Sequence, residues 1–127
     1  MAKASWLEIG HSRDSLVYRA GIYRWTVSSR TYVGKATNLH SRLKEYLNNV
    51  RKIENGLPYR KGNADGFRAI HHALADAKER GLPMKWEVLE FLPKGGVLLE
   101  GERRWIAKLR PDLNGPQNLI AEKSDDR

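Results

Sequence analysis

The sequence predicts an α+β domain, on the strength of two strand-like stretches joined by a short polar break, a third strand-like stretch and three segments with helical periodicity. No internal repeat is visible, and 127 residues are typical of one domain that buries a core without disulfides. We expect an N-terminal extension at residues 1–20, one folded domain at residues 21–118 and a flexible tail at residues 119–127.

The composition is strongly basic, with 23 Lys and Arg against 15 Asp and Glu, a net charge of +8 and a pI near 9.9. Such an excess favours polyanionic partners, nucleic acid above all. There is no cysteine, which excludes disulfides and thiolate zinc sites. The sequence also lacks an apolar stretch of signal-peptide or membrane-spanning length. We therefore expect a soluble cytoplasmic protein that does not bind membranes.

Residues 20–27 and 31–34 are rich in β-branched and aromatic residues and predict a hairpin. With a two-residue loop at residues 29–30, Tyr23 and Tyr32 point to the same face of the sheet. In that register they lie four strand positions apart, about 13 Å along the backbone, so they would flank a substrate group from two sides.

A helix is predicted next, capped by Thr37 or Asn38, because apolar residues recur at helical spacing. This stripe consists of Leu39, Leu43, Tyr46, Leu47 and Val50. Arg42 and Tyr46 lie one turn apart along its margin. A cation and a phenol would therefore face the edge of the sheet together.

Residues 51–65 are polar and basic and predict a long loop, in which Tyr59 could stack on a base. Asp65 is predicted to cap a second helix, which Gly81 ends. Its buried face would hold Phe67, Ile70, Leu74 and Ala77. His71 and His72 match no motif and are expected at the helix surface or the core margin.

Residues 84–92 predict a third strand, with Trp86, Val88 and Glu90 on one side. A last helix follows at residues 97–110, and Pro111 ends it.

Glu102 falls within the apolar stripe of this last helix, which is formed by Leu98, Trp105, Ile106 and Leu109. A carboxylate on a buried face needs a cation, a metal ion or hydrogen bonds. From these residues alone, a structural salt bridge to one of the many cations is favoured over a metal site, because structural ion pairs are commoner. Glu100 projects to the other side as a solvated charge, and Gly101 allows a close approach of the helix to its neighbour.

The sequence resembles the GIY-YIG nuclease family over residues 21–114. Gly21-Ile22-Tyr23 and Tyr32-Val33-Gly34 match its two tripeptides, and Lys35 to Leu39, Arg42-Leu43 and Tyr46 are similar to the segment that follows them in the repair-type branch. Glu102 to Ile106, Arg110-Pro111 and Leu113-Asn114 are similar to the glutamate helix of the family and its closing asparagine.

This resemblance implies a central three-stranded antiparallel sheet flanked by helices, and hydrolysis of DNA phosphodiester bonds with one Mg²⁺ or Mn²⁺ ion per site. Glu102 would be the metal ligand, and Arg42 would hold the scissile phosphate. The full set of site residues implied by the resemblance is Tyr23, Tyr32, Lys35, Arg42, Tyr46, Glu102 and Asn114.

These residue types suit phosphodiester chemistry, in which positioning and neutralisation of charge dominate. The planar guanidinium of Arg42 matches two phosphate oxygens. The general base is open: Tyr23 is the first candidate, with Tyr32 orienting water or phosphate, but these roles could be exchanged, and Lys35 is a third candidate. A phenol has an ordinary pKa near 10, so it would need neighbouring cations to act as a base.

Two other classes of function compete with the nuclease. The first is a non-catalytic, basic nucleic-acid-binding module on the same fold. The second is a protein–protein scaffold that uses Trp6, Tyr59 and Trp86. The DNA could be duplex or branched, and cutting both strands with a single site requires a homodimer or a second encounter. A targeting partner protein is a further expected partner.

Overall fold

The computed structural model describes residues 7–10, 13–62 and 66–114, and it confirms the predicted α+β class. A four-stranded sheet has the order β1-β4-β2-β3. The strands are β1 (Glu8–Ile9), β2 (Gly21–Val27), β3 (Arg30–Ala36) and β4 (Met84–Phe91). The helices are α1 (Leu39–Glu54), α2 (Ala69–Arg80) and α3 (Gly96–Leu109), with short 3-10 turns η1 (Arg13–Leu16) and η2 (Asp112–Asn114).

The expected sheet of three antiparallel strands is wrong by one strand, because β1 joins it in parallel to β4. Ile9 lies opposite Trp86, and the Gly10 amide donates to the Trp86 carbonyl at 2.9 Å. Part of the predicted N-terminal extension is therefore an edge strand. Leu7, which precedes this strand, is buried in the core.

The hairpin of β2 and β3 turns at Ser28 and Ser29, one residue earlier than predicted. Ser28 adopts a left-handed conformation (φ 59°), and its amide donates to the Pro83 carbonyl at 2.8 Å. Tyr32 therefore lies opposite Trp25, two strand positions from Tyr23 rather than four, about 7 Å along the backbone. The prediction that both phenols share a face is confirmed.

A bulge in β4 corrects the predicted facing of Glu90. Tyr23 pairs with Val88, whereas Ile22 pairs with Glu90, so Leu89 is the extra residue. The bulge reverses the alternation, and Glu90 points toward α3, where its carboxylate accepts from the indole of Trp105 at 2.9 Å. Trp86 remains on the face of the sheet that packs against α1 and α2.

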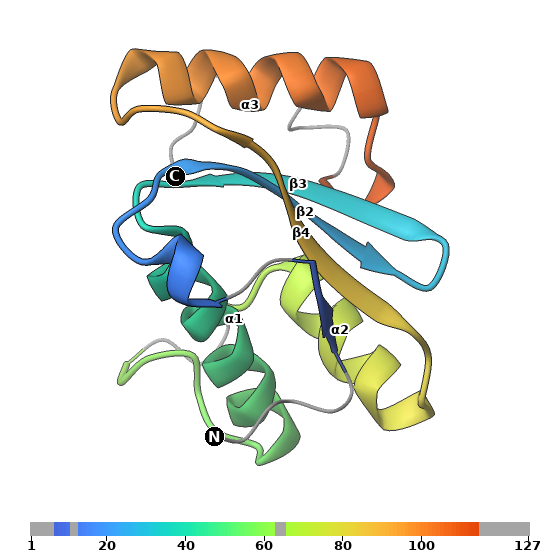
Figure 1. Cartoon of the computed structure of the whole chain (residues 1–127). Helices are drawn as coiled ribbons and strands as arrows, with labels where there is room; N and C mark the ends of the chain where they lie inside the picture. The colour runs from blue at the N-terminus through green and yellow to red at the C-terminus, as the bar shows by residue number, and fades with distance from the viewer. Residues whose placement is uncertain (1–6, 11–12, 63–65, 115–127) are drawn as a thin grey trace.

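The sheet separates two hydrophobic clusters (Figure 1). Helices α1 and α2 cover one face, where the larger cluster contains Tyr23, Trp25 and Trp86. Helix α3 covers the other face, against Ile22 and Val33. The two faces of β2 therefore bury different parts of the domain, which suits a central strand.

Helix α1 begins as predicted: the Asn38 side chain accepts from the amide of Ser41 at 3.2 Å. It continues to Glu54, so the predicted long loop begins four residues later than expected. Helix α2 begins at Ala69 and not at the predicted cap Asp65, which lies outside the described residues together with Trp6 and residues 119–127. Gly81 ends α2 with φ 70°, as predicted.

Helix α3 spans nearly the predicted range, and Arg110 at its end adopts a left-handed conformation (φ 50°). In the part of the chain that the structure describes, no helix combines the length and the apolar character needed to cross a membrane.

Candidate active site

A cavity of about 350 Å³ brings together residues that the sequence places up to 79 positions apart. Strands β2 and β3, all three helices and the segment between α1 and α2 contribute to its lining. Six of the seven predicted site residues line it: Tyr23, Tyr32, Lys35, Arg42, Tyr46 and Glu102. The predicted convergence of the last helix and the hairpin phenols is therefore present in the structure.

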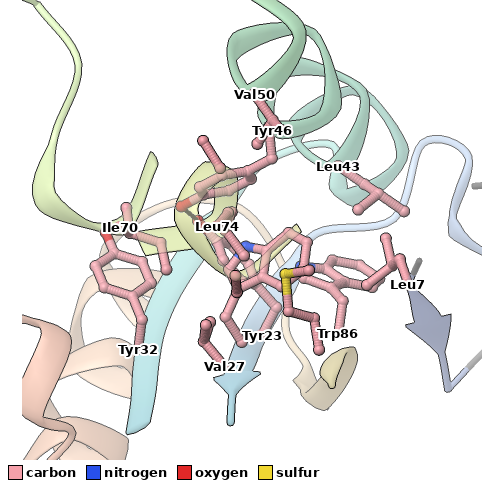
Figure 2. Packing of buried hydrophobic residues seen from close by; sticks show 14 of the residues in the cluster. Leu7, Tyr23, Val27, Tyr32, Leu43, Tyr46, Val50, Ile70, Leu74 and Trp86 are labelled. Carbon is pink, nitrogen blue, oxygen red and sulfur yellow. Dashed lines mark hydrogen bonds between the residues drawn. The ribbon is translucent and has the colours of Figure 1, made fainter. Parts of the chain in front are cut away.

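Three tyrosines enter this region from different elements, Tyr23 from β2, Tyr32 from β3 and Tyr46 from α1 (Figure 2). The hydroxyls of Tyr23 and Tyr46 share a hydrogen bond of 2.7 Å. Gly34 lies opposite Tyr23 in the hairpin, and a Cβ at this position would collide with the Tyr23 hydroxyl. The glycine of the second tripeptide is therefore required by the tyrosine of the first.

Burial raises the pKa of Tyr23 well above its ordinary value, because the anionic phenolate would lose its hydration there. The neighbouring Tyr32 raises it further, whereas Arg42 lowers it. Burial likewise raises the pKa of Tyr46. In the free protein both phenols are protonated at neutral pH, and they can exchange hydrogen bonds with each other.

The cations Lys35 and Arg42 lie along the outer edge of β3. Arg42 donates from its guanidinium to the Lys35 carbonyl at 3.0 Å, and its Nε lies 3.2 Å from the carboxylate of Glu45. The fold brings Arg42 back to β3 because α1 starts directly after that strand. Its planar donors are thus held at the rim of the cavity.

Glu102 reaches the cavity from α3, and its side chain is 20 % exposed. The Lys35 ammonium lies 3.8 Å from its carboxylate. Gly101 allows this approach, since a Cβ there would collide with Leu92. Glu100 is exposed, as predicted. Glu102 therefore has a lysine partner inside the cavity that also holds the phenols, as the salt-bridge explanation expects, and the metal site stays a prediction.

The oxygen ligands of the cavity fit a hard divalent cation. Within residues 7–10, 13–62 and 66–114, no three His, Cys, Asp or Glu side chains gather closely enough to enclose a metal ion. Glu102 and Glu45 are the carboxylates in the cavity lining, and Glu45 contacts Arg42. Mg²⁺ commonly binds through one or two carboxylates and several waters. A site built on Glu102 is consistent with that preference.

Asn114 is the predicted site residue that lies outside the cavity lining. Its amide spans the backbone of Val33: the side-chain oxygen accepts from the Val33 amide, and the nitrogen donates to the Val33 carbonyl, both at 2.8 Å. The amide of Asn114 is therefore engaged in fastening η2 to the outer edge of β3, beside Tyr32.

His71 lines the cavity, although no predicted function involves this residue. Its Nδ1 accepts from the Arg68 amide at 2.9 Å, and its ring lies 5.3 Å from that of Tyr46. Burial, followed by the charges of Arg68 and His72, lowers its pKa to about 4. It is therefore neutral near pH 7 and supports the phenol pair and the start of α2.

Other cavity residues absent from the predicted site are Glu45, Asn49, Arg60 and Arg68, and Tyr59, predicted only to stack on a base, also lines it. Glu45 and Asn49 could have been found, since they follow Arg42 and Tyr46 by three positions on the same helix. Residues 59, 60 and 68 carry no such periodic signal, because they approach the cavity through a long connection whose path depends on tertiary packing.

No family model and no curated protein matches this chain. Among solved structures, the fold is similar to that of a nuclease catalytic domain. That structure is the catalytic domain of the intron endonuclease I-TevI, in a mutant form, and the similarity has a TM-score of 0.52 and 22 % sequence identity. The match covers 76 % of this chain and 90 % of that domain. At this identity the likeness establishes the fold, and activity must be argued from the site.

Proposed function

We propose that this protein is an endonuclease that hydrolyses phosphodiester bonds of DNA with the help of one divalent metal ion. The observation that carries the proposal is the cavity itself, which gathers a partly buried carboxylate, three phenols and several cations. A module that only binds DNA has no need for the costly placement of Glu102 at the inner face of α3.

DNA as the substrate is supported by charge and by structural likeness. The net charge of +8 favours a polyanion. The similar solved structure is the catalytic domain of an endonuclease. Both observations agree with the cations at the rim of the cavity.

In this proposal Arg42 binds the scissile phosphate through two parallel hydrogen bonds, and its contact with Glu45 is released. Lys35 adds a compact positive charge beside it. Glu102 would hold Mg²⁺ or Mn²⁺, which supplies neutralisation of the negative charge that develops on the phosphate oxygens. Asn114 contributes by holding β3 and thereby the position of Tyr32.

We assign Tyr23 as the acceptor of the proton from the attacking water and Tyr32 as the group that orients water or phosphate. The raised pKa of Tyr23 opposes this role in the free protein, so the assignment depends on Arg42 and Lys35 favouring the phenolate once substrate is bound. The hydrogen bond from Tyr46 stabilises a negative oxygen on Tyr23 in the same way. Tyr32 and Lys35 are the other candidates for this role.

The direct test replaces Glu102 with Gln, which keeps the shape of the side chain and removes its charge. Glu102→Gln should lose cleavage of supercoiled plasmid by at least about a hundredfold, corresponding to about 2.7 kcal/mol in activation free energy. Binding of DNA and the circular dichroism spectrum should stay close to those of the parent.

Glu100→Gln is the matched control, because it removes the same charge from the exposed side of the same helix and should cleave like the parent. Chelation of metal with EDTA should abolish cleavage by the parent and spare binding. Full activity of Glu102→Gln in Mg²⁺ would show that the ligand lies elsewhere. Binding without any cleavage by the parent, with or without Mg²⁺, would favour the non-catalytic module.

A further inference from the structure

The segment between α1 and α2 supplies a second basic side to the cavity. Arg60 and Arg68 both contribute to the lining that contains Arg42 and Glu102. Neither arginine belongs to the motifs that predict the catalytic site.

This segment is held in place by contacts of its own. The Lys52 ammonium of α1 donates to the Tyr59 carbonyl at 2.9 Å. The Tyr59 ring packs edge-on against Phe67 at 5.3 Å and lies so close to Gly66 that a Cβ there would collide with it. The Arg68 amide is fixed by His71 at 2.9 Å. Arg60 and Arg68 thus extend from anchored backbone.

The same contacts argue against the predicted stacking of a base on Tyr59. Gly66 and Phe67 already contact this ring, and the Arg60 guanidinium lies over it, 5.0 Å from the centroid. The ring serves as a platform for Arg60, in the manner of a cation–π contact. Arg60 therefore gains a preferred position near the cavity.

The charges of the cavity exceed what one phosphate diester requires. Of the described residues that line it, four are cations, Lys35, Arg42, Arg60 and Arg68, and two are carboxylates. Both carboxylates already contact a cation: Glu102 contacts Lys35, and Glu45 contacts Arg42. Among the described residues, neither Arg60 nor Arg68 forms an ion pair with a carboxylate.

We propose that Arg60 and Arg68 form a second phosphate subsite, which binds a phosphate next to the scissile one on the strand that is cut. This proposal rests on the proposed function, because it takes Arg42 and Lys35 as the site of the scissile phosphate. Two phosphates would hold the strand at two points and fix the direction in which it crosses the cavity.

The test compares two substrates, one with and one without a neighbouring phosphate. Short duplex DNA has neighbouring phosphates, whereas thymidine 5′-(p-nitrophenyl phosphate) has a single diester. Arg60→Ala and Arg68→Ala should each raise KM for the DNA at least about fivefold, with kcat/KM for the nucleotide ester within about twofold of the parent. Lys44→Ala, an exposed change of the same charge on α1, is the matched control.

Measuring the affinity for DNA in the absence of metal tests the subsite even if the protein does not cleave DNA. The slope of log Kd for the DNA against log salt should fall by about 0.9 for each arginine removed, and by less for Lys44→Ala. Circular dichroism checks that the variants fold, and Arg60→Lys should retain most of the affinity as a point charge.

The outcomes separate the two proposals. If the parent cleaves neither substrate but the salt slopes fall as stated, the nuclease function fails, and Arg60 and Arg68 are supported only as a phosphate-binding site of a module that does not cut DNA. Slopes and KM values equal to those of Lys44→Ala would overturn the subsite. An equal loss on DNA and on the nucleotide ester would overturn it too, because the arginines would then act on the scissile phosphate.

Discussion

The hydroxyls of Tyr23 and Tyr46 meet in the interior, where each replaces water as the partner of the other. A change at one of them therefore affects both chemistry and stability. Tyr23→Phe should lower the unfolding free energy by about 1 kcal/mol, since one buried hydrogen bond is lost.

The same variant tests the assignment of the base. Tyr23→Phe should reduce the cleavage rate at least about a hundredfold and remove the rise of rate with pH that belongs to Tyr23. Tyr46→Phe, which leaves the Tyr23 hydroxyl in place, should keep that rise at a lower rate. A Tyr23→Phe profile parallel to that of the parent would transfer the role to Tyr32 or Lys35.

His71 makes the stability of the protein depend on acid. Its pKa is about 4 in the folded protein, below the ordinary value of 6.5, so the folded state binds fewer protons than the unfolded chain between these values. Stability should therefore fall as the pH decreases from about 6.5 to about 4, by up to about 3 kcal/mol from this group. Urea unfolding at pH 7 and pH 4.5 measures the loss.

Two histidine variants isolate this contribution. His71→Gln removes the titrating group, so the loss of stability between the two pH values should shrink. His72→Gln, on the exposed side of the same turn, should retain most of the loss, because burial of His71 is the main cause of its lowered pKa and the charge of His72 a smaller one. An unchanged pH dependence in His71→Gln would place the effect at other groups.

At the scale of single elements, the hairpin depends on the pairing of Tyr23 with Gly34. Gly34→Ala puts a methyl group where the Tyr23 hydroxyl lies, so the ring must shift. We expect a loss of about 1–3 kcal/mol in unfolding free energy, as for other overpacked cores, and a fall in cleavage of at least about tenfold.

Gly96→Ala is the control for this change, since a Cβ at the first residue of α3 meets no atom within 4 Å. Chemical unfolding and plasmid cleavage measure both variants. Equal behaviour of the two would mean that the position of the Tyr23 ring is not critical.

The elements also show what the sequence can predict. The helices α1 and α3 follow from apolar spacing and local caps, so their ends lie within a few residues of the prediction. Two features of the sheet do not follow from apolar spacing or local caps. The bulge at Leu89 reverses the facing of Glu90, and the pairing of β1 requires a partner that is distant in the sequence. Neither leaves a periodic trace in its own segment.

For the whole molecule, the fastening of η2 to β3 joins residues 81 positions apart. Asn114→Ala should leave the amide and carbonyl of Val33 without these partners and cost about 2–3 kcal/mol. Cleavage activity should fall only to the extent that the loss of these hydrogen bonds displaces β3 and Tyr32. Asn48→Ala, in which an exposed asparagine of α1 is removed, should be nearly neutral.

Thermal unfolding and cleavage at a permissive temperature separate these effects. Loss of cleavage with unchanged stability in Asn114→Ala would indicate that the asparagine takes part in the chemistry directly.

The assembly of the cavity explains which site residues were predictable. Tyr23, Tyr32, Lys35, Arg42 and Tyr46 lie within one short stretch, and Glu102 is conspicuous as a carboxylate among apolar residues. His71, Arg60 and Arg68 reach the cavity only because α2 packs against α1. Such residues depend on tertiary packing, and no local pattern indicates them.

The outer edge of β3 is occupied along its length by side chains. Asp112 accepts from the Thr31 amide at 2.9 Å, Asn114 bonds both groups of Val33, and Arg42 takes the carbonyl of Lys35. At the other margin of the sheet, the described part of the chain contributes the two-residue strand β1. At the β3 edge, a second molecule therefore finds few free backbone groups with which to extend the sheet. Two copies that cut opposite strands would have to be brought together by side-chain contacts or by the double helix, and the helical path of the DNA would then set the spacing of their nicks.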